Sequence, residues 1–119
     1  MSTVVKRELS GAADGKAVKV AATATPGTTI HTATSSTTAG DYDEIWLWAY
    51  NSHTIDVQLT IEFGGVTDPD NHIVTTVPFD RGILLVVPGL ILQNSLVVKA
   101  YAGVASVITL MGYVNQYTD

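Results

Sequence analysis

The chain has 119 residues, the length of a single domain, and contains no cysteine, which excludes disulfides, thiolate zinc sites and cysteine nucleophiles. Six Lys and Arg residues against eleven Asp and Glu leave a net charge of −5, and cations this few and dispersed argue against nucleic-acid binding. Only 14% of the residues are charged, whereas an ordinary soluble domain has about 25%, so we expect protein to cover part of the surface.

Residues 1–16 are predicted to form an N-terminal arm, and residues 17–119 a single β-sandwich domain. The arm is expected to be extended or to form a short strand, followed by a turn at residues 13–15. Charged residues at positions 6–8 stand where a secretory signal would need its apolar centre, so we expect a soluble protein that is not exported by its own signal.

Residues 17–24 and 28–35 are predicted to be strands, because small and β-branched side chains dominate both. Pro26 and Gly27 lie between them and predict a type II turn. Proline presets φ at the second turn position, and glycine tolerates the positive φ that the third position requires.

Residues 44–50 and 55–63 carry the clearest strand patterns. In 44–50, Ile, Leu and Ala alternate with Trp46, Trp48 and Tyr50. In 55–63, five apolar residues alternate with Asp, Gln, Thr and Glu, which predicts one core face and one wet face. If the two strands form a hairpin, a two-residue turn places the tryptophans in the core and a three-residue loop places them on the outer face. The pattern leaves both arrangements open.

Further strands are predicted over 72–77, 83–87, 96–101 and 106–117, with turns at 64–65, 68–71, 80–82, 88–89 and 93–95. This makes about eight strands with no helix. The spacing indicates an all-β, single-domain antiparallel β-sandwich or jelly roll.

Residues that could perform catalysis or bind metal are scattered. His31, His53 and His72 lack the short spacing of a metal-ligand pair, and Asp68 and Asp70 lack the later ligands of a calcium loop. We therefore predict surface or internally hydrogen-bonded histidines, a solvated turn at the aspartates, and no cofactor or metal.

The acidic pairs do not form a glycosidase couple either. Asp56 and Glu62 are about 20 Å apart along one strand face, too far for that chemistry. Asp43 and Glu44 point to opposite faces, and we interpret them as residues for solubility and edge protection. Ser52 and His53 are neighbours in a loop, without a GxSxG motif. No enzymatic activity is expected.

Two apolar features are candidates for an interaction surface. The row Trp46, Trp48 and Tyr50 suits a sugar platform, the core or a subunit contact, since aromatic residues are enriched at interface centres. The run 83–92, which Pro88 and Gly89 interrupt, is apolar on both strand faces, which suits either an inner strand of the sandwich or an oligomer interface, and it is too short to cross a bilayer. Together with the arm, these features give the interface candidates Val4, Val5, Lys6, Arg7, Leu9, Trp46, Trp48, Tyr50, Leu84 and Val86.

Five segments resemble a family of small virion proteins of tailed bacteriophages: TATPGTTIHTA at 23–33, EIWLWAYNSH at 44–53, LTIEFGG at 59–65, LLVVPGLIL at 84–92 and GYVNQYT at 112–118. The resemblance covers most of the chain and lies in its overall texture. It implies a capsid decoration, or cement, protein, which sits on the outer capsid shell as an oligomer and joins neighbouring subunits of the major capsid protein. This family has no catalytic residues to transfer.

We therefore expect a non-enzymatic virion structural protein, made in the host cytoplasm and located on the capsid surface. Its expected partners are the major capsid protein and further copies of itself, most simply as a homotrimer, without nucleic acid or membrane. The alternatives are a neck or tail component of the virion, and a carbohydrate-binding module that uses Trp46, Trp48 and Tyr50.

Overall fold

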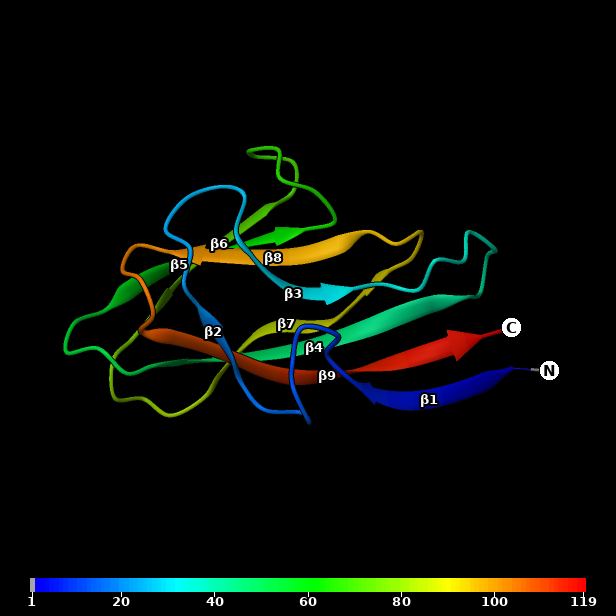
Figure 1. Ribbon diagram of the computed structural model, residues 1–119, viewed down its shortest axis with the longest axis horizontal. Helices are drawn as coiled ribbons and strands as arrows, with labels where there is room; N and C mark the ends of the chain where they lie inside the picture. Colours follow the sequence, from blue (N-terminus) through cyan, green and yellow to red (C-terminus); the bar gives the residue numbers. More distant parts are fainter. Residues whose placement is uncertain (1) are drawn as a thin grey trace.

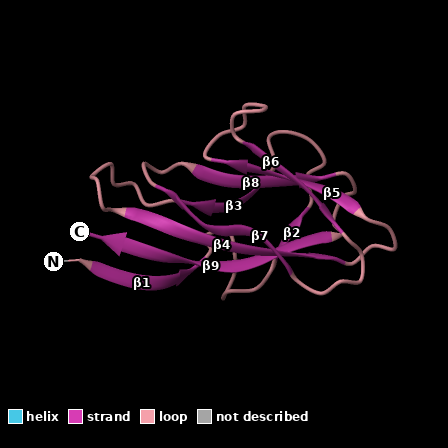
Figure 2. Cartoon of the chain, turned by 180° about the vertical axis from the view of Figure 1, so that it is seen from behind, coloured by secondary structure: helices cyan, strands magenta, loops and turns pink. Residues whose placement is uncertain are grey.

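The computed structural model describes residues 2–119 as two antiparallel sheets packed face to face (Figure 1 and Figure 2). The strands are β1 (Thr3–Glu8), β2 (Val18–Val20), β3 (Thr28–Thr32), β4 (Tyr42–Asn51), β5 (Val57–Phe63), β6 (His72–Val77), β7 (Leu84–Leu92), β8 (Val97–Ala102) and β9 (Ile108–Thr118). The predicted all-β antiparallel sandwich is confirmed, with nine strands. In the described residues, no helix is long and apolar enough to span a membrane.

Sheet A has the strand order β1-β9-β4-β7, and β2 also pairs with β9; sheet B has the order β3-β8-β5-β6. The long strands β4 and β9 pair over ten residues and form the centre of sheet A. In Figure 1, sheet B lies above sheet A, and both chain termini project from the same end of the molecule.

The core lies between the two sheets and is built by strand alternation. In β4 the buried residues Ile45, Leu47 and Ala49 point inward, and in β5 Val57, Leu59 and Ile61 face them from the other sheet. The core is completed by the apolar residues Leu9, Val18, Val20, Ile30, Val77, Val87, Val98, Ala100, Ala102, Ile108, Leu110 and Val114. The alternation of residues 55–63 therefore identified the core face of β5 correctly from Val57 onward, but it was wrong for Ile55, which precedes the strand and is 56% exposed.

Strands β4 and β5 are not a hairpin. They belong to different sheets, and residues 52–56 carry the chain from sheet A to sheet B. The premise under which loop length would orient the tryptophans is therefore wrong. In the structure, Trp46, Trp48 and Tyr50 lie on the outer face of sheet A, because the opposite side of β4 faces sheet B.

Two predicted turns differ from the structure. Pro88 and Gly89 lie inside β7, where the pairing with β4 shifts register, and Gly89 has a φ of 75°. The strand therefore bends at a bulge instead of ending. Gly27 lacks the positive φ of a type II turn, and its backbone amide donates to the Glu62 carboxylate at 2.6 Å. The turns at 80–82 and 93–95 are present, with positive φ at Asp80 and Asn94.

The N-terminal segment forms β1, the edge strand of sheet A. All six of its side chains are exposed, and it pairs with β9 without a register shift. Leu9, directly after β1, is only 1% exposed and belongs to the core. The predicted turn at residues 13–15 follows, with positive φ at Asp14 and Gly15 and a bond from the Lys16 amide to the Ala13 carbonyl.

Candidate functional site

A row of aromatic side chains crosses the outer face of sheet A. Trp46 and Trp48 stack with ring centroids 6.2 Å apart, and Trp48 stacks on Tyr113 of β9 at 6.0 Å. The Lys6 ammonium of β1 lies 4.4 Å from the Tyr113 ring centroid, a cation–π contact. At the other end, Trp46 packs against Gly89, where a Cβ would come within 2.8 Å of the indole. We call this row, Lys6-Tyr113-Trp48-Trp46, the aromatic ladder; it connects β1, β9 and β4 and reaches β7 at Gly89.

The same face is apolar well beyond the ladder, because residues paired across antiparallel strands point to the same side. Trp48 pairs with Met111 of β9 and with Leu85 of β7, and Glu44 pairs with Ile91. Leu85 and Ile91 are 44% and 55% exposed. The outer face of sheet A comprises Val4, Lys6, Glu8, Tyr42, Glu44, Trp46, Trp48, Tyr50, Leu85, Pro88, Ile91, Thr109, Met111, Tyr113, Asn115 and Tyr117.

Glu44 is the anionic group at the centre of this face. Its carboxylate accepts hydrogen bonds from the Trp46 indole at 2.8 Å and from the Asn115 amide at 3.0 Å. These two bonds lower the pKa of Glu44 against a smaller opposing effect of burial. The ionised Glu44 in turn raises the pKa of Tyr117, which stacks on Tyr42 at 4.8 Å. The Glu44 carboxylate, the Trp46 indole and the Asn115 amide therefore have hydrogen-bond partners within this face.

The structure divides the predicted interface candidates. Val4, Val5, Lys6 and Arg7 lie on the exposed β1; Trp46, Trp48 and Tyr50 lie on the outer face of sheet A; Leu84 and Val86 lie on the edge strand β7. Leu9 is buried in the core and offers no side-chain surface to a partner.

The sequence pattern did not identify Tyr113 of β9 as the residue that stacks on Trp48. The ladder contains Tyr113 where the sequence suggested Tyr50, because β9 pairs directly with β4. The alternation of β9 from Thr109 to Tyr117 contained the signal, since its odd-numbered residues all point outward. Strand pairing was needed to connect that signal to the tryptophans.

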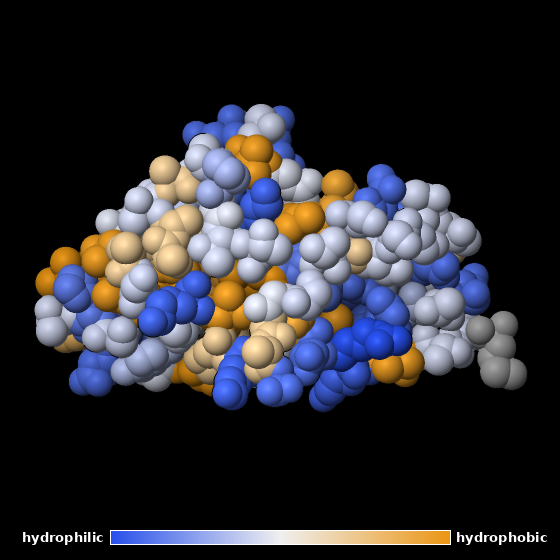
Figure 3. All heavy atoms as spheres, viewed as in Figure 1, coloured by the Kyte–Doolittle hydropathy of each residue, from blue (hydrophilic) through white to orange (hydrophobic). Residues whose placement is uncertain are grey.

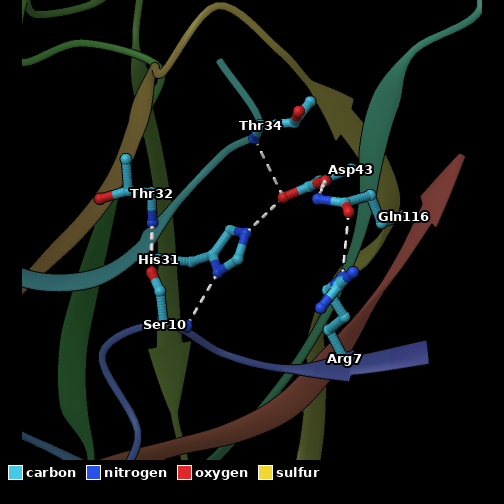
Figure 4. Close-up of polar contacts among 7 residues, drawn as sticks. All are labelled: Arg7, Ser10, His31, Thr32, Thr34, Asp43 and Gln116. Atoms are coloured by element: carbon cyan, nitrogen blue, oxygen red, sulfur yellow. Dashed lines mark hydrogen bonds and ion pairs between the residues drawn. The ribbon is translucent and has the colours of Figure 1, made fainter. Parts of the chain in front are cut away.

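A buried polar network links sheet A to sheet B next to the C-terminal end of β1 (Figure 4). The backbone amide of Ser10 donates to His31 Nδ1 at 3.0 Å, so this nitrogen carries no hydrogen. Nε2 is then the protonated nitrogen and donates to Asp43 Oδ2 at 2.7 Å. The other Asp43 oxygen accepts from Gln116, whose own oxygen accepts from Arg7. Asp43 lies in the central strand β4 and is 1% exposed, so its interpretation as a residue for solubility and edge protection was wrong.

The Ser10, His31 and Asp43 side chains meet, yet their geometry differs from that of a nucleophilic triad. A triad needs the serine Oγ to donate to the imidazole. Here the Ser10 main-chain N–H occupies His31 Nδ1, and Ser10 Oγ accepts from the Thr32 amide at 2.7 Å. The imidazole is also buried. This cluster holds the end of β3 against β4 and against the segment that follows β1.

A second buried carboxylate, Glu62, lies on the outward side of β5 and is fully buried. Its oxygens accept from Thr25 Oγ1 and the Gly27 amide at 2.6 Å each, and from His72 Nε2 at 3.1 Å. The loop that contains Thr25 and Gly27 therefore covers part of the face of β5 that was predicted to be exposed to solvent. The prediction is wrong for Thr60 and Glu62, which are both buried. Burial raises the pKa of Glu62, but the three hydrogen bonds outweigh it and the net shift is downward.

The remaining sequence candidates stay apart. His31 is in β3, His53 in the loop after β4 and His72 in β6, and within residues 2–119 no three His, Asp or Glu side chains are grouped to hold a metal ion. His72 Nδ1 lies 3.6 Å from Oδ1 of the exposed Asp68, while the His72 side chain itself is only 7% exposed.

A shallow hollow of about 420 Å³ lies between the 36–41 loop and the end of β7 and is lined mainly by apolar groups, including Tyr42, Ile91 and Leu96. Figure 3 also shows apolar residues gathered at the end opposite the termini, where the loops after β4 and β6 expose Ile55, Phe79 and Ile83.

Comparisons of the chain with protein-family models, with curated proteins and with solved structures found no match.

Proposed function

We propose that this protein is a non-enzymatic virion structural protein of a tailed bacteriophage, a capsid decoration protein that binds the outer surface of the major capsid shell and stabilises the head. The outer face of sheet A carries the proposal. It presents an apolar surface across four strands, and its aromatic side chains are held in place by stacking before any partner arrives. A partner that docks there orders few side chains, which reduces the entropic cost of binding.

The resemblance to small virion proteins and the low charge of the chain support the same proposal. An extended flat partner, such as the surface of an assembled shell, fits a sheet face better than it fits a cleft. Exposed apolar patches of this extent mark interaction surfaces in soluble proteins.

The test is co-sedimentation of the purified protein with heads from a phage whose copy of the coding sequence is deleted. We expect the native chain to sediment with the heads. Leu85→Lys and Ile91→Lys each place a charge on the outer face of sheet A and should weaken binding at least tenfold, about 1.4 kcal/mol. Val74→Lys is the matched control, because Val74 is 54% exposed on β6, on the opposite sheet.

Sedimentation with tails instead of heads would favour the neck or tail alternative. Failure to bind any particle would contradict a virion role. Equal binding by all three lysine variants would place the contact elsewhere on the chain.

Carbohydrate binding is the second candidate, favoured by the aromatic ladder itself. The stacking of Trp48 against both Trp46 and Tyr113 counts against it, because a pyranose would need a free ring face. A glycan array with the native chain and Trp46→Ala tests this function directly. Binding that is lost in the variant would support it.

A further inference from the structure

Three of the five strands at the sheet margins have their free sides blocked or are too short to pair. In β7, Pro88 has no N–H and the pairing with β4 shifts register twice. The free side of β3 is covered by the segment before it, where the Gly11 amide donates to the Ile30 carbonyl and the Thr32 amide donates to Ser10 Oγ. Strand β2 has only three residues. The margins that remain open within residues 2–119 are β1 and β6.

Strand β1 is the more exposed of these two. All six side chains are exposed, and Val4 and Val5, at 53% and 40%, point to opposite faces of the sheet. The strand contains neither proline nor glycine and pairs regularly with β9 from Thr3 to Glu8. A long, regular edge with apolar side chains on both faces is a template for another strand. Of the six residues in β6, only Val74 is both apolar and highly exposed.

We propose that β1 pairs antiparallel with β1 of a second copy of this chain, about a two-fold axis at Val5. A two-fold axis perpendicular to the sheet places residues opposite each other whose numbers have an even sum. An axis at Lys6 or at Arg7 would place two like cations directly opposite each other, which is unfavourable. With the axis at Val5, the two valines meet, Val4 faces Lys6 of the partner subunit, and Thr3 faces Arg7 of the partner subunit. Charges then lie opposite uncharged residues.

This contact makes one continuous sheet, with four strands from each copy in the order β7-β4-β9-β1-β1-β9-β4-β7. Because the axis is perpendicular to the sheet, both aromatic ladders lie on the same side of it. The contact is isologous, so it replaces the expected trimer with a dimer. A head-to-tail ring would need β1 to meet a complementary second edge; β7 is blocked, and β6 exposes only one large apolar side chain, Val74. The inference stands whether or not the protein binds a capsid.

Single-cysteine cross-linking tests the register cleanly, because the chain has no cysteine of its own. Directly opposite residues have Cβ atoms about 5 Å apart, close enough for a disulfide after small adjustments, so Val5→Cys should cross-link to a dimer under mild oxidation. Thr3→Cys is the matched control on the same strand. Two Thr3 residues would lie four positions out of register, about 13 Å apart, and should not cross-link. A mixture of the Thr3→Cys and Arg7→Cys variants should cross-link, because Thr3 lies opposite Arg7 of the partner subunit in this register.

Sedimentation velocity measures the association without a cross-link. A contact through one strand is smaller than the standard interface of about 800 Å² per partner, so we expect the mass of the native chain to double only at micromolar concentrations or above. Val5→Lys, which places two ammonium groups opposite each other while leaving the core untouched, should keep the mass of one chain.

The proposal is overturned if Val5→Cys stays monomeric under oxidation, if Thr3→Cys alone cross-links equally well, or if Val5→Lys associates like the native chain. Val74→Cys completes the set, since cross-linking there in place of Val5 would assign the contact to β6.

Discussion

Glu62 offers the sharpest test of how the loop before β3 is held on sheet B. Replacing it with alanine removes the acceptor for Thr25 Oγ1, the Gly27 amide and His72 Nε2 together. Breaking a buried, hydrogen-bonded charge network by removing one member costs about 3–5 kcal/mol. Glu62→Gln keeps the shape and one acceptor oxygen but loses the charge, and hydrogen bonds to charged groups contribute about 1.5–3 kcal/mol. We expect a loss of about 3–5 kcal/mol for the alanine variant and about half of that for glutamine.

The pH dependence follows from the direction of the pKa shift. The pKa of Glu62 is lowered in the folded chain from its usual value of 4.5. The stabilisation from the ionised carboxylate is therefore fully present above pH 4.5 and is lost as the pH falls through the lower, folded-state pKa. Asp41 and Glu44, whose pKa values are also lowered, titrate in both the native chain and Glu62→Gln. The difference between these two proteins isolates Glu62.

Urea unfolding followed by far-ultraviolet circular dichroism provides the measurement, at a series of pH values from neutral to well below 4.5. The free-energy gap between the native chain and Glu62→Gln should narrow as the pH falls. A gap that stays constant or widens, or a cost below about 1 kcal/mol for Glu62→Ala, would refute the network argument.

Three further predictions concern stability. Gly112→Ala should cost more than about 4 kcal/mol in urea unfolding, because a Cβ there would overlap the Trp46 carbonyl oxygen; Gly15→Ala, where nothing lies within 4 Å, should cost only the strain of its positive φ. Deleting residues 2–8 should leave the melting temperature nearly unchanged. Deleting residues 2–12 also removes the buried Leu9 and should lower the free energy of unfolding by about 2–5 kcal/mol. Equal effects of the two deletions would show that Leu9 does not stabilise the core. EDTA should leave the melting temperature unchanged, and a fall reversed by calcium or zinc would show a metal site that the ligand spacing did not reveal.

The strand pattern predicted the fold class because alternation reports directly which side of a strand meets the core. It succeeded for Val57, Leu59 and Ile61, which all face sheet A. It failed for Glu62 on the same strand, because the loop with Thr25 and Gly27, 37 and 35 residues earlier in the chain, folds over that side. Alternation records only the strand's own residues, and nothing in it indicates what another segment will cover.

The alternation pattern also could not predict which strands pair with each other. Two consecutive strands were expected to pair as a hairpin, but residues 52–56 connect different sheets, and the neighbour of β4 is the last strand of the chain. Because β9 pairs with β4, Tyr113 stacks on Trp48, a residue 65 positions earlier in the chain. Pro88 and Gly89 likewise suggest a turn by composition, whereas the pairing with β4 on both sides of them turns the same residues into a bulge.

The aromatic ladder contains both tryptophans of the chain. Their intrinsic fluorescence therefore comes from one place, the outer face of sheet A, with no tryptophan elsewhere to dilute the signal. Any molecule that covers this face removes water from the indoles and shifts their emission to shorter wavelength, while a ligand on sheet B leaves the spectrum unchanged. The native chain thus reports occupation of its own candidate docking face, without a label and in dilute solution.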